Sequence, residues 1–176
     1  MSGHNKWSKI KHKKAAGDAE KSKVFGKLSR LIASESKAAG GNVEFPSLKA
    51  AIEKAKAVNM PKDNIERAVK KGATDNSAAM ESVTYEAYGP GGSAIVIEGL
   101  TENRNKTAAE VKHILSKNGY ALAAIGAATW AFKKEAGEWL PQTSIPLSDK
   151  DGESLFALVE ALEDLGEVQG VYTNAE

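Results

Sequence analysis

The chain has 176 residues, of which 41% are hydrophobic and 27% charged, a composition typical of globular proteins. No stretch approaches the ~18 consecutive apolar residues of a transmembrane helix, and the N-terminus lacks the apolar core of a secretory signal. Cysteine is absent, which excludes disulfides, thiolate metal sites and a cysteine nucleophile. These features predict a cytoplasmic protein.

The formal charge is divided unevenly along the chain. Residues 1–71 contain 17 Lys and Arg against 7 Asp and Glu, a charge of +10, whereas residues 72–176 contain 7 against 16, a charge of −9. Such asymmetry indicates a basic part that binds an anionic partner and a separate acidic part. The alternative is two oppositely charged domains that attract each other. Positive charge is densest in the first 30 residues, which contain nine basic side chains against two acidic ones, and this favours the partner-binding interpretation.

Three helices are predicted in the first part. Apolar residues recur at helical spacing from Val24 to Ile32, and Gly40-Gly41 ends that helix. Pro46 and Pro61 are suited to the first turns of a second and a third helix, and Gly72 is the expected stop of the third. We therefore predict a basic helical domain over residues 1–72 and a linker over residues 73–82.

An acidic α+β domain is predicted over residues 83–176. Strands are expected at 83–88, 94–100, 127–132, 139–145 and 168–173, with one helix at 106–118 and a final helix that carries Leu155, Leu158, Val159 and Leu162 and ends at Gly166. Without the first strand, the order is strand, helix, strand, strand, helix, strand. This order predicts a ferredoxin-like fold, an antiparallel sheet with both helices on one face.

The N-terminal segment is the strongest candidate for a binding site. Closely spaced lysines repel one another, and this cost is removed when they replace the counterions of a phosphate backbone. Trp7 is suited to stacking on an unpaired base, although it could equally fold back onto the helical core. The candidate nucleic-acid contacts here are Lys6, Trp7, Lys9, Lys11, His12, Lys13, Lys14, Lys21, Lys23, Lys27 and Arg30.

Several sequence blocks resemble the YebC/PmpR family. The opening residues 3–7 (GHNKW) and 10–16 (IKHKKAA), the middle block 59–68 (NMPKDNIERA), blocks 85–92 (YEAYGPGG) and 100–107 (LTENRNKT), and the ending 168–174 (VQGVYTN) are all similar to family signatures. They are ordered and spread from residue 3 to residue 174. The sequence departs from the family in one respect: members usually carry a further α/β domain between the strands that Lys133–Glu138 joins here.

The resemblance implies a non-enzymatic regulator with a helical first domain. Family members are described as DNA-binding regulators of transcription. The mitochondrial relative is described as a translational activator of cytochrome c oxidase, and bacterial members also as ribosome-associated factors that relieve stalling at proline runs. We expect no cofactor, no metal and no small-molecule substrate. The absent third domain puts any role of that domain in doubt.

Sequence motifs of catalysis are weak. Gly89–Ala94 fits a loose dinucleotide-binding pattern, but that pattern needs a following helix, and an apolar strand follows here. A tight hairpin turn is therefore predicted. The three histidines, His4, His12 and His113, do not form a helical metal-binding pair. We expect no catalytic residues.

A second candidate site lies at the predicted start of the helix at 106–118. Asn103 or Asn105 can cap this helix, and Arg104 beside the exposed N–H groups would suit a phosphate. The alternative is an ordinary capped loop with Arg104 paired to a carboxylate.

The polymer that the protein binds stays open at this stage. Base-specific reading of DNA usually needs several Arg, Asn or Gln side chains on one helix, and the first helix offers mainly lysine. We therefore expect either a DNA-binding regulator of transcription or an RNA- or ribosome-bound translation factor.

Overall fold

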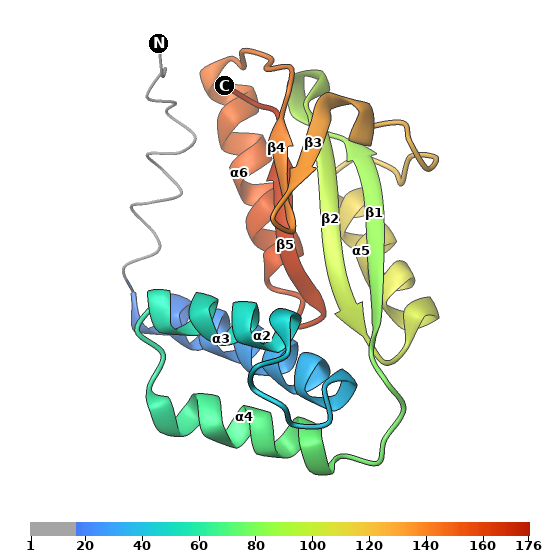
Figure 1. Ribbon diagram of the computed structural model, residues 1–176. Helices are drawn as coiled ribbons and strands as arrows, with labels where there is room; N and C mark the ends of the chain where they lie inside the picture. Colours follow the sequence, from blue (N-terminus) through green and yellow to red (C-terminus); the bar gives the residue numbers. More distant parts are fainter. Residues whose placement is uncertain (1–16) are drawn as a thin grey trace. The chain divides into compact units, whose positions relative to one another are not determined.

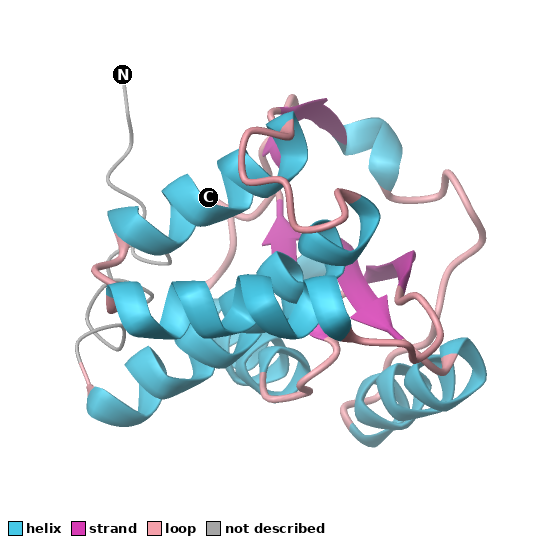
Figure 2. Cartoon of the chain, turned by 60° about the horizontal axis from the view of Figure 1, so that its bottom comes forward, coloured by secondary structure: helices cyan, strands magenta, loops and turns pink. Residues whose placement is uncertain are grey.

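The computed structural model describes residues 17–176, which divide into two compact units, residues 17–81 and residues 82–176 (Figure 1). The first contains helices alone, and the second combines helices with two small sheets (Figure 2). The predicted α+β class is confirmed. Among residues 17–176, no helix is both long and apolar enough to cross a membrane.

Three helices form the first unit: α2 (Asp18–Ala38), α3 (Pro46–Ala57) and α4 (Lys62–Thr74). The starts of α3 and α4 follow the predicted pattern, because Pro46 occupies the first turn of α3 and Pro61 immediately precedes α4. The apolar stripes of the three helices meet in one core, in which Ile32, Leu48 and Ala55 are fully buried.

Gly72 does not end α4, contrary to the sequence prediction. The helix continues to Thr74, and Gly72 is buried within it against the backbone of Ala33 on α2. Beside this contact the buried Ser36 hydroxyl donates a hydrogen bond of 2.6 Å to the carbonyl of Val69. The glycine is therefore required by the close approach of two helices and not by a helix end.

Residues 75–80 connect α4 to the second unit, whose first strand begins at Glu81. The predicted linker 73–82 thus overlaps the last helical turn and the first strand residues. The predicted boundaries, 1–72 and 83–176, stay predictions, because the first 16 residues lie outside the described part.

The main sheet of the second unit has three strands in the order β1-β2-β5, formed by β1 (Glu81–Tyr88), β2 (Ala94–Thr101) and β5 (Val168–Thr173). β2 and β5 are antiparallel. The helices α5 (Arg104–Lys117) and α6 (Asp149–Glu163) both pack on one face, where they bury Ile95 and Ile97 of β2. The prediction that both helices cover one face is confirmed.

A separate hairpin covers the other face of the sheet (Figure 1). It consists of β3 (Phe132–Glu135) and β4 (Glu138–Pro141), preceded by a short 3-10 helix, η2 (Thr129–Ala131). Ala94 and Val96, which alternate with Ile95 and Ile97 along β2, pack against it. β2 is therefore buried on both faces, which explains its continuous apolar sequence.

The two middle strands of the predicted order have other bounds and another partner than expected. The segment predicted as a strand at 127–132 is a loop followed by η2, and the strand predicted at 139–145 ends at Pro141. The two remaining strands pair with each other and not with the main sheet. The reason lies in Glu86, which binds the backbone of the loop and is described below.

Candidate nucleic-acid interface

Seven of the predicted contacts lie outside the described residues. These are Lys6, Trp7, Lys9, Lys11, His12, Lys13 and Lys14. The other four N-terminal candidates lie on α2. Spacings of four and three residues place Lys23, Lys27 and Arg30 on one face of the helix. By the same spacing, Lys21 lies on the face of Phe25 and Leu28, the apolar side.

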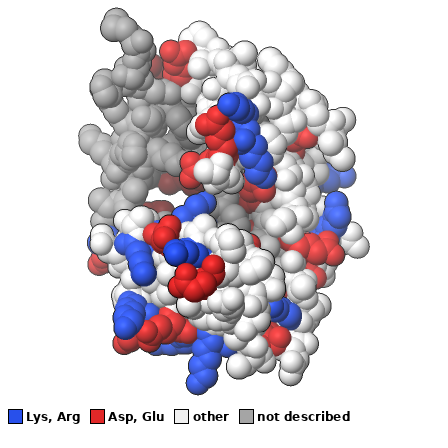
Figure 3. All heavy atoms as spheres, viewed as in Figure 1, with Lys and Arg blue, Asp and Glu red and all other residues white. Residues whose placement is uncertain are grey.

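The environment of the α2 cations is mixed. Lys21 and Lys23 are exposed, while Lys27 and Arg30 are half-buried. Lys23 pairs with Glu20 at 3.7 Å, an exposed pair that contributes little to stability. On the face shown in Figure 3, basic and acidic side chains of the helical unit are interspersed. Residues 17–81 contain 12 Lys and Arg against 9 Asp and Glu, a formal charge of +3, whereas residues 1–16 contain five Lys and no Asp or Glu, a charge of +5.

Asn103 caps α5, as predicted, and Asn105 does not. The Asn103 side-chain oxygen accepts a hydrogen bond of 3.0 Å from the N–H of Lys106. Its own N–H donates to the Thr101 hydroxyl at 2.9 Å, and the Thr107 hydroxyl contacts the same oxygen at 2.8 Å. Thr101 and Thr107 are buried, so the turn into the helix is fixed by polar contacts beneath it.

Arg104 is exposed at the first position of α5. Within residues 17–176 its guanidinium forms no ion pair, so the alternative of an Arg104 side chain paired to a carboxylate is not observed there. The charge of Arg104 acts on Tyr85, whose hydroxyl is buried without a hydrogen-bond partner among these residues. Burial raises the pKa of Tyr85, and the positive charge of Arg104 opposes that shift. Among the described residues, Arg104 is thus a cation without an ion-pair partner at the helix start.

Sequence reasoning missed the role of Glu86. This residue is only 5% exposed, and its carboxylate accepts hydrogen bonds from the N–H groups of Gly126 (2.7 Å), Ala128 (3.0 Å) and Thr129 (2.7 Å). Burial raises the pKa of Glu86, but the three backbone N–H donors outweigh it and hold the pKa below that of a free glutamate. These N–H groups are consequently unavailable to a neighbouring strand.

The loop held by Glu86 exposes apolar side chains. Trp130 is 60% exposed and Ile125 fully exposed, although Ala121–Ile125 has the composition of a buried strand. The indole N–H of Trp130 donates to the Tyr88 hydroxyl at 2.8 Å, and that hydroxyl donates to the carbonyl of Ala127. The local sequence signal of a turn in this loop was Gly126, which adopts a positive φ of 86° in the structure.

Glu98 anchors the hairpin to the sheet. Its Oε1 accepts from the Trp139 indole N–H at 2.6 Å and from the Thr84 hydroxyl at 3.1 Å, and it pairs with Lys134 at 3.3 Å. Glu86 on β1 and Glu98 on β2 thus hold residues 126–139 against the main sheet through hydrogen bonds. The sequence placed both residues in predicted strands but did not predict this role.

The glycine-rich segment at 89–93 is a hairpin turn, as predicted. The N–H of Gly89 donates to the carbonyl of Ser93 at 2.8 Å, Gly91 and Gly92 have positive φ, and β2 follows directly. A dinucleotide site would need a helix at this position. Among the described residues, no group of three or more His, Asp or Glu side chains is arranged to hold a metal ion.

Two family profiles match the chain. The profile of the TACO1/YebC protein N-terminal domain matches residues 5–75, and the profile of the TACO1/YebC second and third domain matches residues 80–137. The fold defines this protein as an α+β protein of two units, of which the first is helical and carries an excess of basic residues. The chain belongs to the TACO1/YebC family.

Curated relatives carry the name "Probable transcriptional regulatory protein". The one from Fervidobacterium nodosum is 47% identical over 169 residues, which are 95% of this chain and 66% of the relative. The chain thus spans just under two-thirds of that relative's length. The one from Pseudothermotoga lettingae is 37% identical over 238 positions, covering 100% of this chain and 94% of the relative. The crystal structure of a conserved hypothetical protein Aq1575 from Aquifex aeolicus has a TM-score of 0.77 and 30% identity, over 90% of this chain and 91% of that one.

The internal shortening predicted from the sequence agrees with these comparisons. The alignment to the Pseudothermotoga protein has 238 positions, although this chain has 176 residues. The match to the second and third domain ends at residue 137, in the turn between β3 and β4. Here Ala136 and Gly137 join the two strands directly, both with positive φ. The chain is a short form of the family.

Proposed function

We propose that this protein is a non-enzymatic, nucleic-acid-binding regulator, and that it acts on transcription by binding DNA. The carrying observation is the separation of charge: +10 over residues 1–71 and −9 over residues 72–176. Phosphate contacts supply most of the affinity of such proteins and position them without reading sequence. The names of the curated relatives support a regulatory role.

The proposed contacts fall into two groups. The first consists of the N-terminal lysines with Lys21, Lys23, Lys27 and Arg30, which would hold the phosphate backbone. The second is the start of α5, where Arg104 would bind a phosphate next to the helix N-terminus, with Asn103 fixing the turn and Asn105 beside it. Charge-assisted hydrogen bonds from a guanidinium are directional, which suits Arg104 to a particular contact in the true target.

A translation factor bound to RNA or the ribosome is the second candidate. The observation that favours it is the composition of α2, which has Arg30 as its one arginine and no Asn or Gln. Arg30 is also half-buried, so α2 offers few groups for reading base edges in a major groove. A protein that recognises the phosphate backbone or the shape of an RNA needs no side chains that read base edges.

The salt dependence of binding tests the phosphate contacts. The full chain is titrated with duplex DNA, single-stranded RNA and ribosomes at 50 to 200 mM salt. If about four phosphates are engaged on duplex DNA, affinity should fall roughly a hundredfold over this range. A variant with Ser in place of Lys6, Lys9, Lys11, Lys13 and Lys14 should show a much shallower slope. The control replaces the exposed Lys112 and Lys117 of α5 by Ser, and its slope should match the wild type.

The preferred polymer decides between the two candidates. Tight, competitor-resistant binding to promoter DNA supports transcription, whereas retention on ribosomes with weak duplex binding supports translation. Arg104→Ala should lower affinity for the preferred target about tenfold and leave binding to random duplex nearly unchanged. A flat plot of affinity against salt for all three ligands would refute the phosphate-binding proposal itself.

A further inference from the structure

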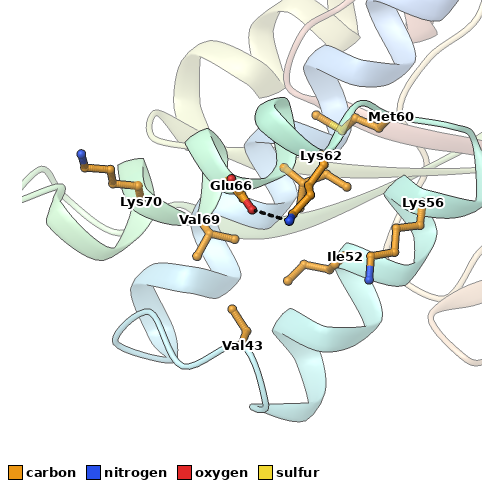
Figure 4. A pocket seen from close by; sticks show the side chains of 9 residues that line it. Val43, Ile52, Lys56, Met60, Lys62, Glu66, Val69 and Lys70 are labelled. Atoms are coloured by element: carbon orange, nitrogen blue, oxygen red, sulfur yellow. Dashed lines mark ion pairs between the residues drawn. The ribbon is translucent and has the colours of Figure 1, made fainter.

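An apolar pocket of about 490 Å³ lies between α3 and α4 in the helical unit. Figure 4 shows Val43, Ile52 and Val69 converging on it from three segments of the chain. Met60 and Ile65, each 5% exposed, are its most deeply buried lining residues, while Val43 is 46% exposed. Part of the core of this unit is therefore accessible to a partner.

The pocket is lined by parallel rows of side chains. On α3, Ile52 and Lys56 are four residues apart, and on α4, Ile65 and Val69 have the same spacing. Such rows create the ridges and grooves into which another helix packs. The pocket thus has the periodicity of a helix-binding groove.

Positive charge surrounds the apolar surface. Lys56, Lys62 and Lys70 line the pocket with one acidic residue, Glu66, which pairs with Lys62 at 3.4 Å. Within residues 17–176, Lys56 and Lys70 form no ion pair, and Figure 4 shows them at opposite ends of the pocket. An occupant with carboxylates flanking an apolar face would complement both features.

We propose that this pocket binds an acidic amphipathic helix of a protein partner. Apolar side chains at positions i, i+3 or i+4, and i+7 of the partner would contact Ile52, Ile65 and Val69, and its Glu or Asp side chains would pair with Lys56 and Lys70. The flexible thioether of Met60 adapts to different apolar side chains. This site goes beyond the proposed nucleic-acid contacts, because its binding surface is apolar.

A nucleic acid fits the pocket less well than a helix does. Single-stranded nucleic acid gains most from stacking its bases on aromatic rings. The five apolar lining residues are Val43, Ile52, Met60, Ile65 and Val69, none of which is aromatic. A phosphate backbone would pair with the lysines but leave the aliphatic surface exposed to water. The combination of aliphatic surface and basic rim therefore favours a peptide.

The test uses the full chain and defined peptides. A fluorescent helical peptide with leucines at i, i+3, i+4 and i+7 and glutamates at its flanks is titrated by anisotropy. Three control ligands are titrated in the same way: a scrambled peptide of the same composition, a peptide with lysine in place of each glutamate, and a single-stranded RNA. Methyl NMR spectra follow Met60 and Ile65 in each titration. The acidic amphipathic peptide should shift both methyl signals and bind at least tenfold more tightly than the other two peptides.

Variants locate the binding to the pocket. The double variant Lys56→Glu, Lys70→Glu should weaken peptide binding at least tenfold, and Val43→Asp should weaken it similarly through the exposed apolar edge. The matched control is Lys54→Glu, Lys71→Glu, which changes the same net charge on the same two helices at exposed positions outside the pocket lining. Its effect on peptide binding should stay below twofold.

Several results would contradict the proposed peptide site. Equal binding of the scrambled or basic peptide, absence of methyl shifts with the acidic peptide, or an equal loss in the control variant would overturn the proposal. Methyl shifts produced by the RNA, competing with the peptide, would reassign the pocket to nucleic acid. Salt-dependent nucleic-acid affinity is measured separately, so the failure of this proposal leaves the proposed regulatory function unaffected.

Discussion

Alanine substitution is expected to have opposite effects at two glycines of the helical unit, Gly72 on α4 and Gly26 on α2. A Cβ atom at position 72 would lie 2.1 Å from the carbonyl oxygen of Ala33 and 2.8 Å from the Cβ of Ser36. At position 26, a Cβ would meet no described atom within 4 Å. Both residues are within helices, so the gain in helix propensity is the same at both sites.

The magnitude at Gly72 follows from the contact distances. Ordinary contact with a Cβ is 3.4–4 Å, so α2 and α4 must separate by at least about 1 Å, since the nearest opposing atom, the carbonyl oxygen of Ala33, belongs to the backbone. Overpacking of this kind costs about 3 kcal/mol. Separation also weakens the 2.6 Å hydrogen bond from Ser36 to Val69, which contributes about 1 kcal/mol. The helix-propensity gain offsets about 1 kcal/mol, which leaves a net destabilisation of about 3 kcal/mol.

Thermal unfolding of the full chain, followed by circular dichroism at 222 nm, measures the effect. For a unit of this size, about 3 kcal/mol corresponds to a fall in Tm of roughly 10–20 °C in the helical transition. Gly26→Ala should instead raise stability by about 0.5–1 kcal/mol. Amide hydrogen exchange should show the loss at Gly72→Ala localised to α2 and α4. A Gly72→Ala variant as stable as the wild type would show that α2 and α4 do not pack this closely.

Three further substitutions test polar contacts. Glu86→Gln should destabilise the acidic unit by about 2 kcal/mol at pH 7, because a buried carboxylate with three N–H donors loses its charge. The folded pKa of Glu86 is lowered, so its contribution is complete above the unfolded pKa of about 4.3 and is lost as pH falls toward the folded value. The difference between wild type and variant in urea unfolding should therefore shrink from pH 7 to pH 3, and a constant difference would contradict the charge argument. Asn103→Ala should cost about 1 kcal/mol through loss of the α5 cap, measured by chemical denaturation, with Asn105→Ala as a near-neutral control. Ser36→Ala should cost about 1 kcal/mol in the same assay, because the carbonyl of Val69 loses its buried donor; no loss would show that water replaces it.

Local patterns determined much of the fold. The stripe from Val24 to Ile32 predicted α2, Pro46 and Pro61 marked the starts of α3 and α4, and Asn103 predicted the α5 cap. Each of these features depends on residues within one or two helical turns, where propensity and capping act directly. The family and its internal shortening were likewise readable from ordered sequence blocks.

The candidate binding residues were proposed from residue type and local position, and they stay predictions. Charge density pointed to the N-terminal lysines as candidates, because lysine-rich segments carry their signal in composition alone, whereas Arg104 was proposed from its position at a predicted helix start. Composition does not show which cations share a face or find a partner. The pocket between α3 and α4 escaped the sequence for the same reason: Val43, Ile52 and Val69 become neighbours only when the helices pack.

What only the tertiary structure decided concerns residues whose role depends on a distant partner. Gly72 has the sequence signal of a helix stop, yet the backbone of Ala33, far away in the chain, requires a glycine inside the helix. Residues 127–132 have the composition of a strand, yet Glu86 takes the N–H groups that a strand would offer to its neighbour. In both cases a long-range contact overrides a local preference worth at most about 1 kcal/mol, because close packing and a buried charged hydrogen bond each contribute more.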